Sequence, residues 1–361
     1  MKVVIFCGGY GTRMWPASRK SFPKQFFPLI GKKSFFQLTY SRFRRIFSPK
    51  DIFISTEENY VKFIRKQAPS LPRENIIAEP ERKDNLGAIG LATAIIHRRF
   101  PNEVMIVSWS DHLIRQEEEF LRAVKTAGEY AGKTGLIVSV DEEPRYPSVH
   151  HGWVKLGETV DEYNGLRIVR IVEHFEKPDL ARAKRFFVDG GYLLNTGYRA
   201  WRTDVMLGYF QKYVPQMYAG LVIITGHLGK KNFETYLYRE YHKFEKDSIE
   251  TGIFEKLSAD ARVTIPVQVG WEDSGTWELF YRALRVNERE NVVEGEGLVE
   301  HLDSSGNLII GQKEKMIGII GLKDIVVVDT KDGLLVCNMK ETDKVKKLFK
   351  ILEKSNPKYV E

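Results

Sequence analysis

The sequence predicts an α/β protein with a doubly wound, mainly parallel mixed sheet, followed by a small C-terminal β-helix-like domain. Two observations lead to this prediction. As far as residue 140, short apolar runs rich in Val and Ile alternate with longer amphipathic segments, which is typical of repeated βαβ units. Beyond Asn287 the runs are short, β-rich and separated by turns. Because 361 residues exceed one typical domain, we expect one domain at residues 1–286 and a second at 287–361.

The first half of the chain alternates predicted strands with predicted helices. The strands are expected at 3–6, 51–55, 76–78, 104–108 and 136–140, and the helices at 34–46, 58–67, 86–100 and 117–131. Pro101 stands just past the third helix, where a helix is expected to end. Parallel strands joined in this way bring their carboxyl ends to one edge of the sheet, where ligands bind.

The second half is more mixed. We expect antiparallel strands at 152–156 and 166–175, a helix at 180–189, a strand and turn at 192–201, helices as far as residue 257, a strand at 264–269 and a helix at 277–286. The β-rich runs that follow lie at 297–299, 308–310, 317–320, 325–328 and 334–337, and an amphipathic helix at 342–354 ends the chain. Stacked β-coils suit the spacing of these runs.

Composition narrows the class of protein. Hydrophobic residues make up 43% of the chain and charged residues 29%, as in soluble globular proteins, and no apolar stretch approaches a membrane span. The N-terminus enters a strand pattern directly, so we expect no signal peptide. Cys7 and Cys337 are the only cysteines, which favours a cytoplasmic protein without disulfides.

The net charge of +7 raises the question of nucleic-acid binding. The basic residues are spread along the chain, with small clusters at 42–45 and 344–347, and no nucleic-acid motif accompanies them. A solvated basic surface is therefore the favoured interpretation, and we expect no nucleic-acid partner.

A glycine-rich loop after the first strand is the most informative motif. Gly8, Gly9, Gly11 and Thr12 precede Arg13, and Lys24 follows within a short distance. Such a loop, carrying fixed cations, is suited to a polyphosphate. The spacing does not match the dinucleotide fingerprint or the P-loop. Glu79 and Asp111 also follow predicted strands, so they are expected at the same edge of the sheet.

The full string resembles one known family. Gly-Gly-x-Gly-Thr-Arg-x-x-Pro, followed by Pro-Lys-Gln-Phe at 23–26, is similar to the pyrophosphorylase loop of sugar-phosphate nucleotidyltransferases, and Trp-Pro-x-Ser-Arg at 15–19 is similar to that of the mannose-1-phosphate guanylyltransferases. The resemblance covers nearly the whole chain. It implies a Rossmann-like nucleotidyltransferase domain with a left-handed β-helix, and transfer of GMP from GTP to α-D-mannose 1-phosphate, which gives GDP-mannose and pyrophosphate.

The resemblance also implies roles for individual residues. Arg13 and Lys24 would stabilise the pyrophosphate, with Arg19 supporting the loop, and Asp111 and Asp273 would hold Mg²⁺. The nucleotide would contact the following residues: Gly8, Gly9, Gly11, Thr12, Arg13, Lys24, Glu79, Asn85 and Asp111. The sugar phosphate would contact Gly152, Glu176, Lys177 and Asn195, and Lys177 would balance the charge of the attacking phosphate.

Several positions depart from the family pattern. Tyr10 replaces a small residue in the glycine loop, Lys83, Asp84 and Asn85 replace Arg, Asn and Thr, and His151 and Trp153 replace the aromatic residues on either side of Gly152. Three alternatives stay open: a different hexose such as glucose 1-phosphate, a different NTP, and a regulatory subunit that binds nucleotide without turnover. Monomer and homodimer are both compatible with the sequence.

Overall fold

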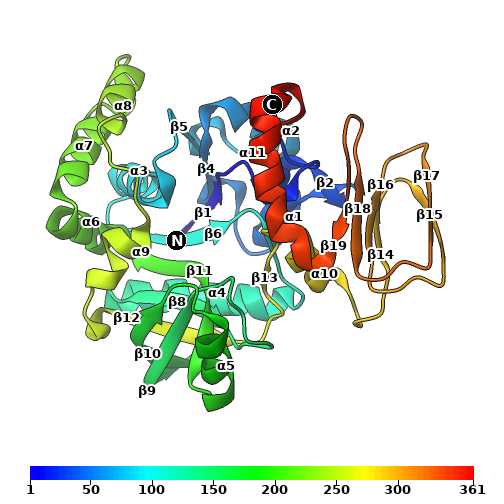
Figure 1. Cartoon of the computed structure of the whole chain (residues 1–361). Helices are drawn as coiled ribbons and strands as arrows, with labels where there is room; N and C mark the ends of the chain where they lie inside the picture. Colours follow the sequence, from blue (N-terminus) through cyan, green and yellow to red (C-terminus); the bar gives the residue numbers. More distant parts are fainter.

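A nine-stranded mixed sheet forms the centre of the computed structural model, which describes all residues from Met1 to Glu361 (Figure 1). Its strand order is β5-β4-β1-β6-β11-β8-β12-β10-β9. The strands are β1 (Lys2–Cys7), β4 (Ile52–Glu57), β5 (Ile76–Glu79), β6 (Val104–Trp109), β8 (Ile137–Glu142), β9 (Trp153–Tyr163), β10 (Leu166–Phe175), β11 (Tyr192–Arg202) and β12 (Arg262–Val267). The predicted α/β class and its alternation of strands and helices are confirmed.

The sheet is parallel in its first part and mixed beyond. Strands β5, β4, β1 and β6 are parallel to one another, and so are β8 and β12. Strand β11 lies antiparallel between β6 and β8, and β10 and β9 form an antiparallel pair at the far edge. The carboxyl ends of β1, β5 and β6 therefore meet at one edge, and each is followed by a segment that carries candidate site residues.

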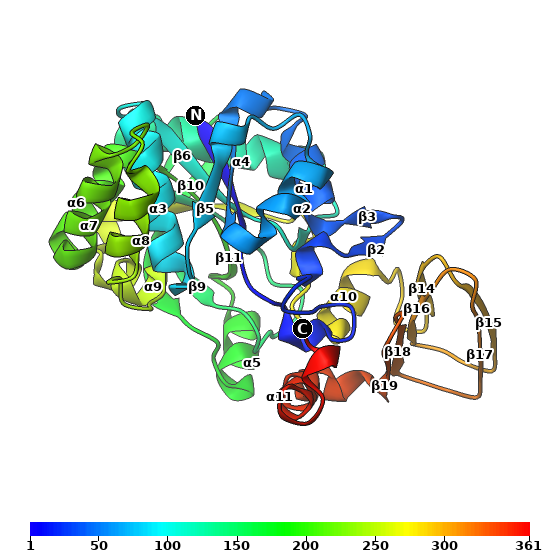
Figure 2. The same ribbon diagram turned by 90° about the horizontal axis from the view of Figure 1, so that it is seen from above.

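Helices cover both faces of the sheet because successive residues of its strands point in opposite directions. Val3 and Ile5 of β1 belong to one apolar cluster, whereas Val4 and Phe6 belong to another. The first cluster is closed by α1 (Phe35–Phe43), α2 (Val61–Gln67), α4 (Glu117–Thr134) and α5 (Leu180–Asp189). The second is closed by α3 (Asp84–Arg99), α6 (Thr203–Tyr213), α7 (Pro215–Gly226), α8 (Phe233–Tyr241) and α9 (Ile249–Gly252). Figure 2 shows α3 and α6–α9 together on one flank.

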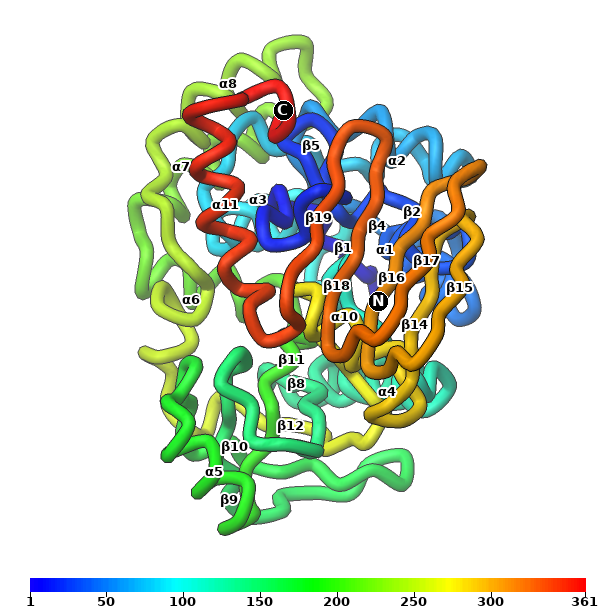
Figure 3. Tube along the Cα trace, turned by 45° about the vertical axis from the view of Figure 1, so that its right-hand side comes forward, coloured from blue at the N-terminus to red at the C-terminus, as the bar shows by residue number.

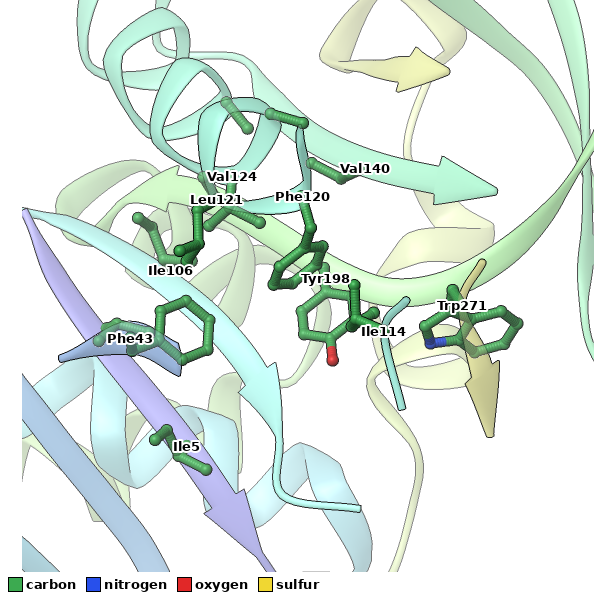
Figure 4. Packing of buried hydrophobic residues seen from close by; sticks show 14 of the residues in the cluster. Ile5, Phe43, Ile106, Ile114, Phe120, Leu121, Val124, Val140, Tyr198 and Trp271 are labelled. Carbon is green, nitrogen blue, oxygen red and sulfur yellow. The ribbon is translucent and has the colours of Figure 1, made fainter. Parts of the chain in front are cut away.

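The first apolar cluster reaches towards the site. Phe120 of α4 packs edge-on against Tyr198 of β11, with 4.7 Å between ring centroids. Figure 4 shows this pair between Val140 on one side and Ile114 on the other, with Trp271 beyond Ile114. The segment that carries the expected metal ligand Asp273 therefore begins on a buried aromatic anchor.

The C-terminal segment forms two facing parallel ladders, as expected for stacked β-coils. One sheet has β14 (Val292–Gly295), β16 (Leu308–Gly311), β18 (Ile325–Asp329) and the antiparallel β19 (Leu334–Asn338), and the other has β15 (Leu298–Leu302) and β17 (Met316–Ile320). The buried Asn307 side chain donates to Asn291 Oδ1 and the Leu322 carbonyl, and accepts from the Ile325 N–H, which ties consecutive coils together.

The end of the chain returns to the segment that follows the glycine loop. Helix α11 (Val345–Ser355) follows the 3₁₀-helix η8 (Met339–Lys344) and packs with α10 (Trp277–Leu284) in a third apolar cluster that includes Met14 and Trp15. Figure 3 shows α11 running back from the β-coils, with the C-terminus beside the first loops of the chain. None of the helices combines the length and apolar character that crossing a bilayer requires.

Two short pairs of strands were not expected from the sequence. Strands β2 (Pro28–Ile30) and β3 (Lys33–Ser34) form a hairpin after the glycine loop. Strands β7 (His112–Leu113) and β13 (Glu272–Asp273) form a two-residue antiparallel ladder. The second pair matters for the site because it joins two distant motifs.

Candidate active site

The glycine loop is held in shape by neighbouring side chains. Gly11 lies in the left-handed region with φ +65°, and a Cβ atom there would lie 2.7 Å from Lys24 Cγ, so the loop requires glycine at this position. The buried Gln25 amide donates to the carbonyls of Cys7 at 3.2 Å and Gly9 at 3.3 Å. Gln25 belongs to the Pro-Lys-Gln-Phe motif, but no sequence pattern indicated that its side chain supports the loop.

Lys24 connects three segments of the site. Its buried Nζ lies 2.8 Å from Asp111 Oδ2 and donates to the Ser274 carbonyl at 3.0 Å. Burial alone would raise the pKa of Asp111, but the nearby Lys24 ammonium outweighs it, so the pKa is lowered and the carboxylate is ionised at neutral pH. The glycine loop, the segment after β6 and the segment after Trp271 therefore meet at one ammonium group.

The β7–β13 ladder places Asp273 beside the Asp111 segment. Asp273 pairs with His112 in the ladder, one residue from Asp111. His112 Nδ1 accepts a hydrogen bond from Trp271 Nε1 at 3.0 Å, which fixes the orientation of the ring. A Cβ atom on Gly275 would lie 3.0 Å from an Arg13 guanidinium nitrogen and 3.3 Å from an Asp273 carboxylate oxygen. Arg13 and Asp273 thus approach the same small residue.

The donor set fits a hard divalent cation. Asp273 lies in the ladder and Asp111 directly precedes it in sequence, and carboxylates are the type of oxygen ligand that Mg²⁺ prefers, with its other ligands commonly taken from water and substrate phosphates. No group of three or more His, Cys, Asp or Glu side chains is arranged so that it could hold a metal ion by itself. An ion held by Asp111 and Asp273 would therefore take its remaining ligands from water and from a phosphorylated ligand.

A cleft of about 290 Å³ opens beside the glycine loop. Its walls include five of the expected nucleotide contacts: Gly8, Gly9, Glu79, Asn85 and Asp111. Glu79 already accepts hydrogen bonds at both carboxylate oxygens, from Ser55 Oγ at 2.9 Å and from the Tyr241 hydroxyl at 2.8 Å. Burial raises the pKa of Glu79 to about 7, against the lowering effect of these two hydrogen bonds. Glu79 is therefore a fixed part of the wall.

A second cleft of about 350 Å³ holds the expected sugar contacts. Gly152, Glu176, Lys177, Asn195 and Asp273 all line it. A Cβ atom on Gly152 would lie 3.1 Å from Glu176 Oε2 and 3.5 Å from Asn195 Cβ, so this position keeps space between the two side chains. Lys177 Nζ pairs with Glu176 Oε1 at 2.9 Å and is largely exposed. Site residues predicted from four motifs that are distant in the sequence thus line the same cleft.

Trp109 separates the two clefts and was not assigned a site role from the sequence. It lines both of them, together with Asn85. A Cβ atom on Gly197 would lie 2.5 Å from Trp109 Nε1, so glycine at this position leaves room for the N–H edge of the indole ring. Trp153, Trp201 and Trp277 are buried in the core, whereas Trp271 is buried and also contributes to the lining of the second cleft.

Tyr10, one of the residues that depart from the family pattern, contacts Arg82. The Arg82 guanidinium lies 4.0 Å from the centre of the Tyr10 ring, a cation–π arrangement, and its Nε lies 3.1 Å from Glu57 Oε1. Tyr10 therefore stacks on the loop after β5 and does not crowd the phosphate-binding backbone. Arg19 pairs with Asp332 of the C-terminal β-segment at 2.9 Å and also donates to the carbonyls of Pro16 and Ser18, so it ties the segment after the glycine loop to the C-terminal strands.

Comparisons with known proteins agree with this architecture. The fold is that of a doubly wound α/β protein, a class in which ligands bind at the carboxyl edge of the sheet, where the first cleft opens. The family model described as nucleotidyl transferase matches residues 2–290, and one described as the MannoseP isomerase/GMP-like beta-helix domain matches residues 298–352. The chain therefore belongs to the nucleotidyl transferase family.

Named relatives make the likeness more specific. The chain is 29% identical over 357 residues to the mannose-1-phosphate guanylyltransferase of Klebsiella pneumoniae, covering 98% of this chain and 74% of that protein. It is 30% identical over 348 residues to the xanthan biosynthesis protein XanB of Xanthomonas campestris, covering 96% and 72%. A crystal structure described as mannose-1-phosphate geranyltransferase from Thermus thermophilus superposes with a TM-score of 0.87 at 26% identity, covering 98% and 99%.

Proposed function

We propose that this protein transfers GMP from GTP to the phosphate of α-D-mannose 1-phosphate, forming GDP-mannose and releasing pyrophosphate. The observation that carries the proposal is the contact of Lys24 with both Asp111 and the Ser274 carbonyl, beside a cleft lined by Asp273, Glu176 and Asn195. A phosphate-binding loop thereby adjoins a polar cleft of suitable size for a sugar phosphate. The likeness to proteins named for mannose 1-phosphate favours that sugar.

The chemistry needs alignment and charge neutralisation. The attacking group is already an ionised phosphate, so no general base is required, and the nucleophile needs only to be held in line with the α-phosphorus. Lys177 would hold the attacking phosphate, and Glu176 and Asn195 would accept from and donate to the sugar hydroxyls. Gly152 would let the sugar approach the backbone.

On the nucleotide side, the backbone N–H groups of Gly8, Gly9, Gly11 and Thr12 would cradle the phosphates. Arg13 and Lys24 would neutralise the departing pyrophosphate, and Asn85 would contact the nucleoside. Mg²⁺ held by Asp111 and Asp273 would supply charge stabilisation between the phosphates when bound. Removing one fixed cation, as in Lys24→Met, is expected to lower kcat by about 10²–10³, as for a lost oxyanion-hole donor.

Release of pyrophosphate tests the proposal directly. The pure protein is incubated with Mg²⁺, one of the four NTPs, and either mannose 1-phosphate or glucose 1-phosphate. The highest rate is expected with GTP and mannose 1-phosphate. A higher rate with another NTP or with glucose 1-phosphate would replace the assigned substrate, and no release with any pair from a folded protein would refute the transfer activity.

Matched carboxylate variants test the assigned metal ligands. Asp111→Asn and Asp273→Asn are expected to abolish Mg²⁺-dependent turnover. Glu272→Gln is the control, because Glu272 is adjacent to Asp273 but is engaged by Arg145 and Tyr146, at 3.0 Å each. Near wild-type turnover in either aspartate variant would show that the residue is not a ligand.

A further inference from the structure

A chain of partly buried polar contacts joins Asn85 to Asn195. Asn85 lines both clefts, and Asn195 lines the second. Between them lie Glu250 of α9 and Arg199 of β11. Asn85 Nδ2 donates to Glu250 Oε2 at 3.4 Å, Arg199 pairs with Glu250 Oε1 at 2.9 Å, and the same guanidinium donates to Asn195 Oδ1 at 3.3 Å. Glu250 itself lines the second cleft, and its two carboxylate oxygens contact Asn85 and Arg199.

The central ion pair is largely shielded from water. Arg199 and Glu250 side chains are 9% and 20% exposed, and the Arg199 guanidinium lies 4.1 Å from the centre of the Phe254 ring. Burial would raise the pKa of Glu250, but Arg199 outweighs it and lowers the pKa, so both groups are charged at neutral pH. Buried ion pairs generally add little net stability because desolvation opposes their attraction. A contribution to stability therefore does not by itself account for the Arg199–Glu250 ion pair at this position.

The pair fixes the orientation of the Asn195 amide. Besides Arg199, Asn195 Oδ1 accepts the Gly197 N–H at 3.1 Å, and Asn195 Nδ2 lies 3.0 Å from His174 Nε2. With Oδ1 occupied by two donors, the amide cannot flip without losing both hydrogen bonds. One N–H of Nδ2 stays available for a hydroxyl oxygen.

The opposite end of the chain fixes Asn85. Its Oδ1 accepts the Ile249 N–H at 2.7 Å, next to Glu250. A nucleotide that displaced Asn85 would therefore disturb both the Ile249 backbone and the Glu250 carboxylate, and Glu250 is the ion-pair partner of Arg199.

We propose that Arg199 and Glu250 are positioning residues that hold Asn195 for the sugar ligand and make sugar binding depend on nucleotide at Asn85. The inference rests on the proposed function, because it takes the two clefts as the nucleotide and sugar-phosphate sites. Both residues act through their neighbours, and neither is assigned a contact with the reacting atoms.

Calorimetry on the full chain measures the coupling. Mannose 1-phosphate is titrated into the protein with Mg²⁺, with and without the α,β-methylene analogue of GTP, which cannot release pyrophosphate. In the wild type, the analogue is expected to tighten sugar-phosphate binding. In Glu250→Gln, which keeps the side-chain shape and removes the charge, the ratio of the two Kd values is expected to fall to within about twofold of one.

Kinetics separate positioning from a general structural effect. Loss of a hydrogen bond from a charged donor predicts a KM for mannose 1-phosphate raised at least about tenfold in Glu250→Gln and Arg199→Lys, with the KM for GTP little changed. In an Asn195→Ala background, Glu250→Gln is expected to have no further effect on that KM. Asp204→Asn is the matched control, because it breaks the Arg202–Asp204 ion pair next to the far end of the same strand.

The outcomes distinguish this inference from the proposed function. If the wild type binds both ligands but folded Glu250→Gln and Arg199→Lys keep wild-type coupling and KM, the positioning role is wrong and the proposed function stands. Additive effects of Glu250→Gln and Asn195→Ala would equally overturn it. If the wild type binds neither ligand, the proposed function fails and this inference fails with it.

Discussion

The buried carboxyl of Glu79 predicts a stability that depends on pH. Its pKa is raised from 4.5 to about 7, first because burial disfavours the charged form, while hydrogen bonds from Tyr241 and Ser55 oppose this effect. The folded protein therefore binds this proton more tightly than the unfolded chain does. The resulting stabilisation is fully present below about pH 4.5 and is lost as the pH rises through 7. The change Glu79→Gln removes the titration and keeps a side chain of the same shape.

The size of the effect follows from the two pKa values. The interval between 4.5 and about 7 corresponds to about 3 kcal/mol at 1.36 kcal/mol per pKa unit. At pH 8 the wild type has lost nearly all of this stabilisation, whereas at pH 5 it has lost only about 1 kcal/mol of it. Between pH 5 and pH 8, the free energy of unfolding of Glu79→Gln is therefore expected to rise by about 2 kcal/mol relative to that of the wild type.

Urea unfolding of both proteins at the two pH values gives this difference directly. Glu142, whose pKa burial also raises to about 7, is present in both proteins, so its contribution cancels in the comparison. If the free energies of unfolding of wild type and Glu79→Gln change in parallel between pH 5 and pH 8, then Glu79 is not held as a desolvated carboxyl and the reasoning is refuted.

Two further predictions concern the glycine loop and the end of the chain. Gly11→Ala is expected to displace Lys24 and to lower the rate of pyrophosphate release more than 100-fold. Gly31→Ala is the control, because Gly31 also has a positive φ but no atom lies within 4 Å of a Cβ built there, and it should keep near wild-type turnover. Equal rates in the two variants would contradict the steric argument. Deleting residues 357–361 removes the fully buried Val360 and should lower the free energy of unfolding by about 1.5–3 kcal/mol. Urea titration measures this change. An unchanged free energy of unfolding would show that the end of the chain is not docked in solution.

Much of the fold was predictable because it depends on local patterns. The continuous burial of β1 from Val3 to Cys7 follows directly from its apolar run, since residues facing both sides of a parallel sheet must be apolar. Helix α1 begins where Ser34 and Gln37 form a capping box, close to the expected start at residue 34. In a long helix or strand, many residues follow the same apolar–polar period, so the existence and order of such elements are well determined by the sequence.

The contacts that complete the site were not predictable in the same way. A two-residue ladder such as β7–β13 has no periodicity, so nothing local indicated that Asp273 pairs beside His112. Arg19 matched a motif of the glycine loop, yet its partner Asp332 lies in the β-coils. Glu250 was passed over because its significance depends on Arg199, a residue on a distant strand. Each of these roles is set by tertiary packing between segments far apart in the sequence.

The C-terminal segment explains how an irregular loop can be held still enough for the proposed chemistry. Between Arg13 and Lys24 the chain has little regular structure, so its backbone groups need outside partners. Trp15 Nε1 donates to the Tyr359 carbonyl, and the N–H groups of Lys20 and Ser21 donate to the carbonyls of Val360 and Glu361, each at 2.9 Å. The last residues of the chain thus bind the segment between the two cations assigned to the pyrophosphate, and the β-coils and α11 carry them there. Because fixed charges stabilise a transition state only when they do not have to reorganise, docking of this segment is part of the catalytic architecture as proposed.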